Sequence, residues 1–123
     1  MAKIFLDTNI FIDFVEKRGK NIEDKLGQHD LIISPFSIHI LIYITKQKIP
    51  HDRLLKIVNL FLIIDLNKVI SDKALHGPTS DFEDNVQLHS AVAAECDYFL
   101  TNDEKLLNMK FFGKTKITDS LQR

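Results

Sequence analysis

Three aspartates occupy positions where an α/β fold would bring them together. Asp7 directly follows an apolar run at 4–6, and Asp103 comes shortly after a second run at 98–100. Asp84 stands near the start of a helical pattern. Because the carboxyl ends of parallel strands and the N-termini of their crossover helices meet at one edge of a sheet, we expect these three side chains to converge.

Converging carboxylates predict a site for a hard metal ion. Carboxylates that lie close together raise one another's pKa unless a cation neutralises them. Oxygen-only ligands favour Mg²⁺ or Mn²⁺, and such an ion activates water and stabilises the charge on a phosphodiester during hydrolysis. Taken singly, each acid is better explained as a helix cap or a partner of the helix dipole. Only the joint placement of the acids favours a catalytic site.

Short apolar runs alternate with longer helical patterns along the chain. Five runs predict strands buried on both faces of a parallel sheet: 4–6, 31–33, 62–64, 98–100 and 116–118. The intervening patterns predict helices over 8–18, 35–46, 50–61 and 80–95, with a short helix over 103–109. This alternation indicates an α/β domain with right-handed crossovers.

Capping residues set the expected helix ends. Thr8 is predicted to cap the first helix, and Gly19 to end it. Ser34 precedes Pro35 at the start of the second helix, and Pro50 opens the third. A capping box that joins Ser80 to Glu83 is predicted at the start of the fourth helix, with Asp81 complementing the helix dipole.

Composition describes an ordinary globular chain. The 123 residues, with a mass of 14.2 kDa, fit one domain over 1–123. Sixteen basic and 17 acidic residues give a net charge of −1, which excludes a polybasic arm but not a locally basic RNA-binding surface. The single cysteine, Cys96, cannot form an internal disulfide and suits a reducing cytoplasm. The apolar stretches are too short to span a membrane, and no secretory leader is expected.

The helix predicted over 35–46 is apolar nearly all round, with isoleucine or leucine at most positions between 38 and 44. One face would pack on the sheet, and the remainder needs other cover. A second subunit and the helix at 50–61 are equally suitable sources of that cover.

Three segments resemble PIN-domain proteins, in order and at the expected separations. The opening at 3–13, KIFLDTNIFID, looks like the start of that family. The segment at 81–87, DFEDNVQ, is similar to the block that carries its third acid, and CDYFLTND at 96–103 resembles its strand ending in Thr-x-Asp. The resemblance covers nearly the whole chain. It implies a three-layer fold with a central parallel sheet of four to five strands flanked by helices.

The resemblance also implies an activity and partners. The activity is that of a Mg²⁺- or Mn²⁺-dependent ribonuclease of the VapC-like toxin type, which hydrolyses RNA. The implied partners are an antitoxin protein and a second copy of the chain in a homodimer. By position, Asp7, Asp84 and Asp103 match the family's metal-binding acids. Asn9 and Thr101 match polar residues that hydrogen-bond in the acidic pocket.

One position departs from the family pattern. Ser34 matches the family's Ser/Thr after the second strand, but the Glu expected six positions later is Ile40 here. Adjacent His39 would point about 100° away around a helix, and it is predicted to be a hydrogen-bonded structural residue. Asp81 or Glu83 is a candidate to restore the lost carboxylate.

Two alternatives remain at this stage. Without the usual Glu, the chain is also explained as a non-catalytic PIN-like module that binds RNA or protein. A receiver-like signalling domain with Asp65 as phospho-acceptor fits poorly, because Asp7 has no acidic neighbour and the last strand is followed by an acid, not a lysine.

Overall fold

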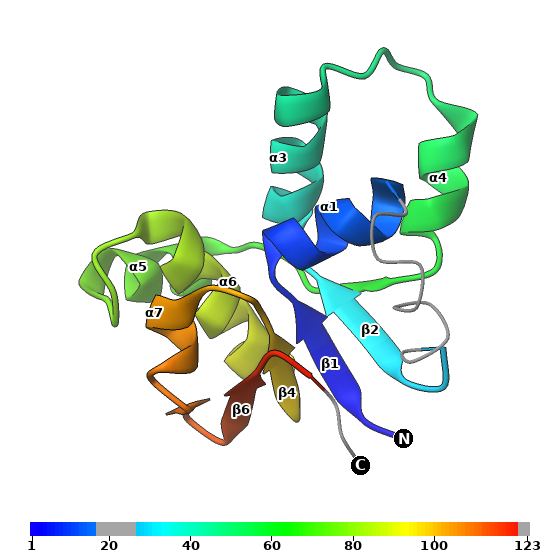
Figure 1. Ribbon diagram of the computed structural model, residues 1–123. Coiled ribbons are helices and arrows are strands. Elements are labelled where there is room, and N and C mark those ends of the chain that lie inside the picture. Colours follow the sequence, from blue (N-terminus) through cyan, green and yellow to red (C-terminus); the bar gives the residue numbers. More distant parts are fainter. Residues whose placement is uncertain (17–26, 121–123) are drawn as a thin grey trace.

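The computed structural model describes residues 1–16 and 27–120, and it contains a six-stranded sheet in the order β3-β2-β1-β4-β6-β5 (Figure 1). Five of these strands are parallel, and β5 joins one edge in the antiparallel direction. The strands are β1 Lys3–Leu6, β2 Asp30–Ile33, β3 Leu62–Ile63, β4 Tyr98–Leu100, β5 Phe111–Phe112 and β6 Thr115–Thr118. All five predicted strands are therefore present, and the α/β prediction is confirmed.

Helices cover both faces of the sheet, as a three-layer fold requires (Figure 1). The described helices are α1 Thr8–Glu16, α3 Pro35–Thr45, α4 Asp52–Val58, α5 Lys68–His76, α6 Phe82–Ala93 and α7 Glu104–Leu107. Residues of α1, α3 and α4 form one core cluster with the sheet, and residues of α6 and α7 form a second cluster on its other face. Helix α5 packs mainly against α6.

The central strands β1, β2 and β4 lack polar alternation because both of their faces are buried. The prediction of burial on both faces was wrong for the edge strand β3, whose two residues are exposed, and for β6, in which buried and exposed residues alternate. In β1, Ile4 and Leu6 pack against the α1 layer, whereas Phe5 packs against the α6 layer. The rings of Phe5 and Phe99 stack on neighbouring strands with centroids 5.5 Å apart. These residues have no exposed surface, so the two central strands are fixed firmly and hold the loops that follow them in place.

The structure corrects several predicted helix ends. Helix α1 starts at Thr8, and the carbonyl of Asp7 accepts the first helical bond from the Phe11 amide (2.9 Å), so the cap is Asp7. Its predicted end at Gly19 lies outside the described residues. The cap of α6 is Asp81, not Ser80: the Asp81 side chain accepts from the Asp84 amide at 3.0 Å.

The start of α4 also differs from its prediction, and two short elements were missed. Helix α4 begins at Asp52 with His51 as its cap, two residues after Pro50. Helix α5 and strand β5 were not predicted. In α5 only Ile70 and Ala74 are buried, so its apolar face is too narrow to produce a clear helical pattern. Strand β5 has only two residues.

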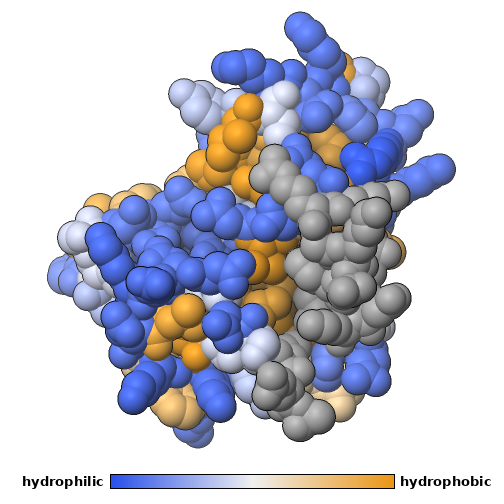
Figure 2. All heavy atoms as spheres, in the orientation of Figure 1, coloured by the Kyte–Doolittle hydropathy of each residue, from blue (hydrophilic) through white to orange (hydrophobic). Residues whose placement is uncertain are grey.

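Helix α4 covers only part of α3. A groove of about 230 Å³ runs between them, lined by residues of α3, the following loop and α4. Tyr43 and Ile44 at the end of α3 are 71% and 58% exposed, and Figure 2 shows hydrophobic atoms at the surface over this helix. Packing against α4 therefore covers part of the apolar surface of α3 and leaves the rest of that surface exposed. Within 1–16 and 27–120, no helix has the length and apolar character to cross a membrane.

Candidate functional site

Asp7 is held at the carboxyl edge of the sheet by contacts from two strands. Its amide donates to the carbonyl of Leu100 at 3.0 Å, which ties the end of β1 to the end of β4. The residue is 6% exposed, and its carboxylate accepts a 2.6 Å hydrogen bond from the Thr101 hydroxyl. Burial raises the pKa of Asp7, and the Thr101 hydrogen bond opposes this effect. The fold thus keeps a carboxylate in a place that disfavours its charge.

Thr101 joins two of the predicted acids. The residue is fully buried, and its hydroxyl oxygen also accepts from the Asp103 amide at 3.0 Å. The Asp103 carboxylate accepts from the Lys105 amide and so caps α7. Asp103 is near enough to Asp7 to contribute to the raised pKa of its carboxyl. One threonine side chain therefore sets the positions of the loops that carry Asp7 and Asp103.

Asp84 comes from the first turn of α6 and completes the group. Burial is the main cause that raises its pKa from 3.8 to about 7, followed by the negative charges of Asp81, Asp7, Asp103 and Glu83. Burial, Asp81 and Asp7 likewise raise the pKa of Glu83. The charges of Asp7 and Asp103 thus act on Asp84. The fold brings these three aspartates near one another although Asp7 and Asp103 are far apart in sequence.

Gln87 belongs to this site and was not identified from the sequence. Its side chain is fully buried, and its Oε1 accepts a 2.7 Å hydrogen bond from the amide of Thr8. Among the described residues its amide nitrogen has no partner at full hydrogen-bonding distance, yet it lies near enough to lower the pKa of Asp7. The available signal was its spacing: Gln87 follows Asp84 by three positions and so shares its face of the helix.

Other predicted residues lie apart from the acids or serve the fold. Asn9 is exposed, and its side chain makes no hydrogen bond within the described part of the chain, so its role in the acidic pocket stays a prediction. The buried Ser34 hydroxyl accepts from the Phe36 amide at 3.1 Å and caps α3. Contact with the site comes instead from Ser37, whose hydroxyl lies 3.0 Å from that of Thr8.

The sequence departs from the PIN-domain pattern at Ile40, which follows His39. The first of these side chains is apolar, and the second lies at the surface. Ile40 is partly buried and packs against the core on the α1 side of the sheet. His39 is exposed and stacks on Tyr43 with ring centroids 6.5 Å apart, so its prediction as a hydrogen-bonded structural residue was wrong. Neither residue supplies a carboxylate to the site.

The residues at this edge fit a divalent cation in charge and in donor type. All are carboxylates or neutral oxygen donors, and the raised pKa values of Asp7 and Asp84 reflect burial and repulsion that a cation would relieve. Among residues 1–16 and 27–120, no three carboxylate, histidine or cysteine side chains already stand close enough to hold a metal ion. Binding therefore requires the carboxylates to close around the ion.

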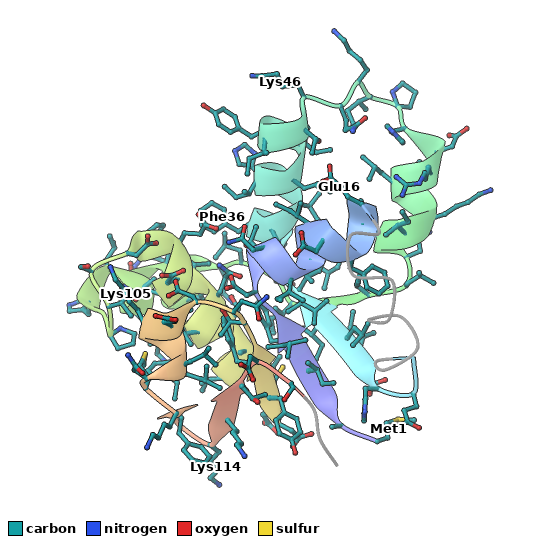
Figure 3. The ribbon with its side chains drawn as sticks, viewed as in Figure 1. Met1, Glu16, Phe36, Lys46, Lys105 and Lys114 are labelled. Atoms are coloured by element: carbon teal, nitrogen blue, oxygen red, sulfur yellow. The ribbon has the colours of Figure 1, made fainter. Side chains whose placement is uncertain are left out.

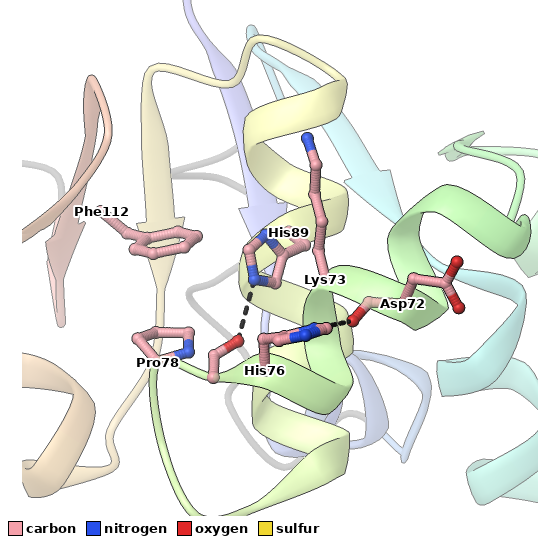
Figure 4. Close-up of a pocket in the computed structure, with 7 residues that line it drawn as sticks. Asp72, Lys73, His76, Pro78, His89 and Phe112 are labelled. Atoms are coloured by element: carbon pink, nitrogen blue, oxygen red, sulfur yellow. Dashed lines mark hydrogen bonds between the residues drawn. The ribbon is translucent and has the colours of Figure 1, made fainter.

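A second cavity, of about 460 Å³, lies away from these acids between α5, α6 and β5 (Figure 4). His89 donates from Nε2 to the carbonyl of Gly77 at 2.9 Å, and its ring packs edge-on against Phe112. His76 donates from Nδ1 to the carbonyl of Asp72. These contacts fix the connection between α5 and α6, and none of the predicted site residues lines the cavity.

Comparison with known proteins identifies the family. A PIN-domain family model matches residues 3–105, from β1 to α7. Twelve chains of known structure match. One comes from the crystal structure of VapBC2 from Rickettsia felis bound to a DNA fragment from their promoter, with a TM-score of 0.67 and 18% identity over 94% of this chain and 97% of that one. No curated protein matched. The chain belongs to the PIN-domain family.

Proposed function

We propose that this PIN-domain protein is a toxin-type endoribonuclease that hydrolyses RNA phosphodiester bonds with Mg²⁺ or Mn²⁺. The observation that carries the proposal is the arrangement at the carboxyl edge of the sheet, where the Thr101 hydroxyl bonds both the Asp7 carboxylate and the Asp103 amide. The charges of Asp7 and Asp103 also raise the pKa of Asp84. Family membership and the structural likeness to a chain of VapBC2 support the proposal. Buried carboxylates that repel one another destabilise a fold, so their retention is best explained by a cation that binds them.

Each of these residues has a distinct task in the proposed reaction. Asp7, Asp84 and Asp103 hold the ion, and Thr101 orients Asp7 through its 2.6 Å hydrogen bond. When bound, the ion supplies activation of the attacking water and neutralises charge on the phosphodiester. Gln87 fixes the first amide of α1 and thereby the backbone that carries Asp7. Asn9, exposed beside Asp7 and Thr8, is placed to reach RNA rather than the ion.

Lysines after β4 provide the expected attraction for RNA. Lys105 lies on α7, and Lys114 lies in the turn between β5 and β6 (Figure 3). Lys110 precedes β5 and Lys116 lies in β6, and all four side chains are exposed. Lys105 follows Asp103 by two residues, whereas Lys114 precedes β6 at the opposite edge of the sheet. We expect these cations to attract the phosphate backbone, so binding should weaken with rising salt concentration.

We also propose an antitoxin protein and a second copy of the chain as partners. The exposed Tyr43 and Ile44 at the end of α3 supply apolar surface for a homodimer. Light scattering is expected to give a mass near twice the 14.2 kDa of the chain. A monomer at all concentrations up to about 100 μM would refute the dimer and leave the nuclease proposal intact.

The nuclease proposal is tested with a single-stranded RNA library in the presence of Mn²⁺, Mg²⁺ or EDTA. We expect internal cleavage with either ion and none in EDTA. RNA that binds but is not cut under any condition would contradict the proposal and favour the alternative, a non-catalytic PIN-like module. The observation behind that alternative is the apolar, partly buried Ile40 packed against the core, because it leaves this position of α3 without a carboxylate for the site.

A further inference from the structure

The cavity between α5, α6 and β5 is lined by ring side chains (Figure 4). Its volume of about 460 Å³ lies within the usual range of small-molecule sites. Phe112, His89 and Pro78 supply the rings, and those of Phe112 and His89 meet edge-on with centroids 5.0 Å apart. Phe112 and His89 are half-buried, whereas Pro78 is exposed. A flat ring that enters the cavity can therefore pack on rings that the fold already holds in place.

The charged groups at the cavity favour an anion. Lys73 reaches the cavity from α5, is exposed, and has neither a hydrogen bond nor an ion pair within the described part of the chain. The carboxylate of Asp72, which also lines the cavity, is engaged by the Lys68 ammonium at 2.6 Å. Lys73 is thus left without a neutralising partner, and a phosphate group would complement its charge.

The two histidines at the cavity can also engage a ligand. A backbone carbonyl only accepts hydrogen bonds, so His89 carries a proton on Nε2, which donates to Gly77 at 2.9 Å. His76 in the same way carries a proton on Nδ1, which donates to the carbonyl of Asp72. Within 1–16 and 27–120, the second nitrogen of each ring has no hydrogen-bond partner. A few polar groups on a largely apolar lining are typical of a ligand site.

The cavity lies close to the acids but is separate from them. Its lining includes Gly77 and Pro78, which belong to the connection that leads to the Asp81 cap of α6. His89 follows Asp84 by five residues, which corresponds to about 7.5 Å along the helix axis and a rotation of about 140°. A ligand in the cavity therefore leaves the acids free, and a flexible strand that passes the start of α6 can reach both places.

We propose that this cavity binds one nucleotide of a single-stranded RNA, with the base packed on Phe112 and His89 and the phosphate at Lys73. Stacking on aromatic side chains combined with cations along the backbone is a common way of holding single strands. The inference rests on the proposed function, because it adds a binding subsite for the same substrate outside the acidic pocket. A free nucleotide has the same chemistry, and the experiment separates the two sources.

Fluorescence anisotropy of a labelled single-stranded RNA of about ten nucleotides, measured in EDTA, tests the subsite without cleavage. Phe112→Leu keeps an apolar side chain and removes the ring, so the Kd for this RNA should rise about fivefold or more. Phe111→Leu is the matched control, because neighbouring residues of a strand project to opposite faces and Phe111 does not line the cavity. Its Kd should change by less than about twofold. Circular dichroism verifies that both variants are folded.

The cation at the cavity is tested in the same assay. Lys73→Ala removes the charge proposed to hold the phosphate, so the Kd should rise about threefold or more, and the affinity should depend less on salt concentration. Lys56→Ala is the control, since Lys56 is an exposed lysine of α4. An equal loss of affinity in Lys73→Ala and Lys56→Ala would show a general effect of charge and contradict the phosphate contact.

Nuclear magnetic resonance titrations with AMP and with inorganic phosphate locate the binding and identify its source. AMP should shift the amide signals of Gly77, His89 and Phe112, and phosphate should shift them less. Shifts confined to other residues, or equal losses of RNA affinity in Phe112→Leu and Phe111→Leu, would overturn the cavity as a nucleotide site. If the RNA binds no more tightly than AMP, the cavity serves a free nucleotide and its assignment to the RNA substrate is wrong.

Failure of this inference can be told apart from failure of the proposed function. If Phe112→Leu binds RNA as the wild type does and the wild type cleaves RNA with Mn²⁺, only the subsite is wrong. If the wild type cleaves no RNA under any condition and Phe112→Leu still loses affinity, the nuclease proposal is wrong and the nucleotide site stands.

Discussion

Asp84→Asn is expected to lower the rate of RNA cleavage by about 100-fold or more and, without divalent ions, to stabilise the protein at pH 8. The loss of activity follows from removing a charged ligand of the proposed ion. The gain in stability follows because Asp84 is charged at pH 8 in an environment that disfavours its charge. Opposite effects on activity and stability in one variant are typical of a functional site.

The stability effect has a defined pH window. In the folded protein the pKa of Asp84 is raised from 3.8 to about 7. The folded state therefore holds this proton more tightly than the unfolded state, and the free energy of unfolding falls as pH rises from about 4 to 7. Asp84→Asn should match the wild type at pH 4 and exceed it at pH 8. Because Asp84 is only half-buried and solvent screens its charge, we expect a gain of about 1 kcal/mol.

Thermal unfolding in EDTA at pH 4 and pH 8 measures this effect. Asp72→Asn serves as control, since Asp72 lies on α5 in an exposed ion pair with Lys68 (2.6 Å) and should change stability by less than about 0.5 kcal/mol. Added Mn²⁺ should then stabilise the wild type and not Asp84→Asn. Equal or lower stability of Asp84→Asn at pH 8 would contradict the electrostatic description of the site.

Thr101→Val is expected to destabilise the protein by about 2–3 kcal/mol and to reduce cleavage at least tenfold. Valine keeps the shape but removes the hydroxyl that donates to Asp7 and accepts from the Asp103 amide. A buried carboxylate then loses a charge-assisted hydrogen bond, which costs more than a neutral one. Since that hydrogen bond lowers the pKa of Asp7, its loss also weakens the charged form that binds the ion.

Thr115→Val is the matched control for this prediction. Thr115 is also buried, and its hydroxyl donates to the carbonyl of Cys96 at 2.8 Å. The same substitution there removes one neutral hydrogen bond, so about 1 kcal/mol should be lost with cleavage unchanged. Urea unfolding and an initial-rate assay give both quantities. Equal losses of stability and activity in the two variants would show that Thr101 has no special relation to the acids.

The sequence was sufficient for the features that depend on strong local patterns. Residues 4–6 and 98–100 are apolar at every position because both faces of β1 and β4 are buried, and such runs are easily recognised. The rule that parallel strands share a carboxyl edge then placed Asp7 and Asp103 near each other. The contribution of the Asp103 charge to the raised pKa of Asp7 agrees with that placement, whereas their roles as metal ligands stay predictions.

Features set by tertiary contacts were missed. Gln87 looked like one polar residue in a mixed helix, and only the fold brings it to the amide of Thr8. Asn9 was expected to hydrogen-bond in the pocket, but its exposed side chain in the first turn of α1 has no hydrogen-bond partner among the described residues. The cap of α6 was misassigned because Ser80, Asp81 and Glu83 offer overlapping capping patterns, and the choice between them depends on the path of the preceding loop.

A crystal structure of the protein with Mn²⁺, located by its anomalous scattering, tests the central claim most directly. We expect an ion about 2.0–2.3 Å from carboxylate oxygens of Asp7, Asp84 and Asp103, close to the distances usual for hard divalent cations. We also expect these side chains to move together relative to the metal-free protein. If crystals at saturating Mn²⁺ hold no ion at this edge, or hold one only elsewhere, the proposed metal site is wrong.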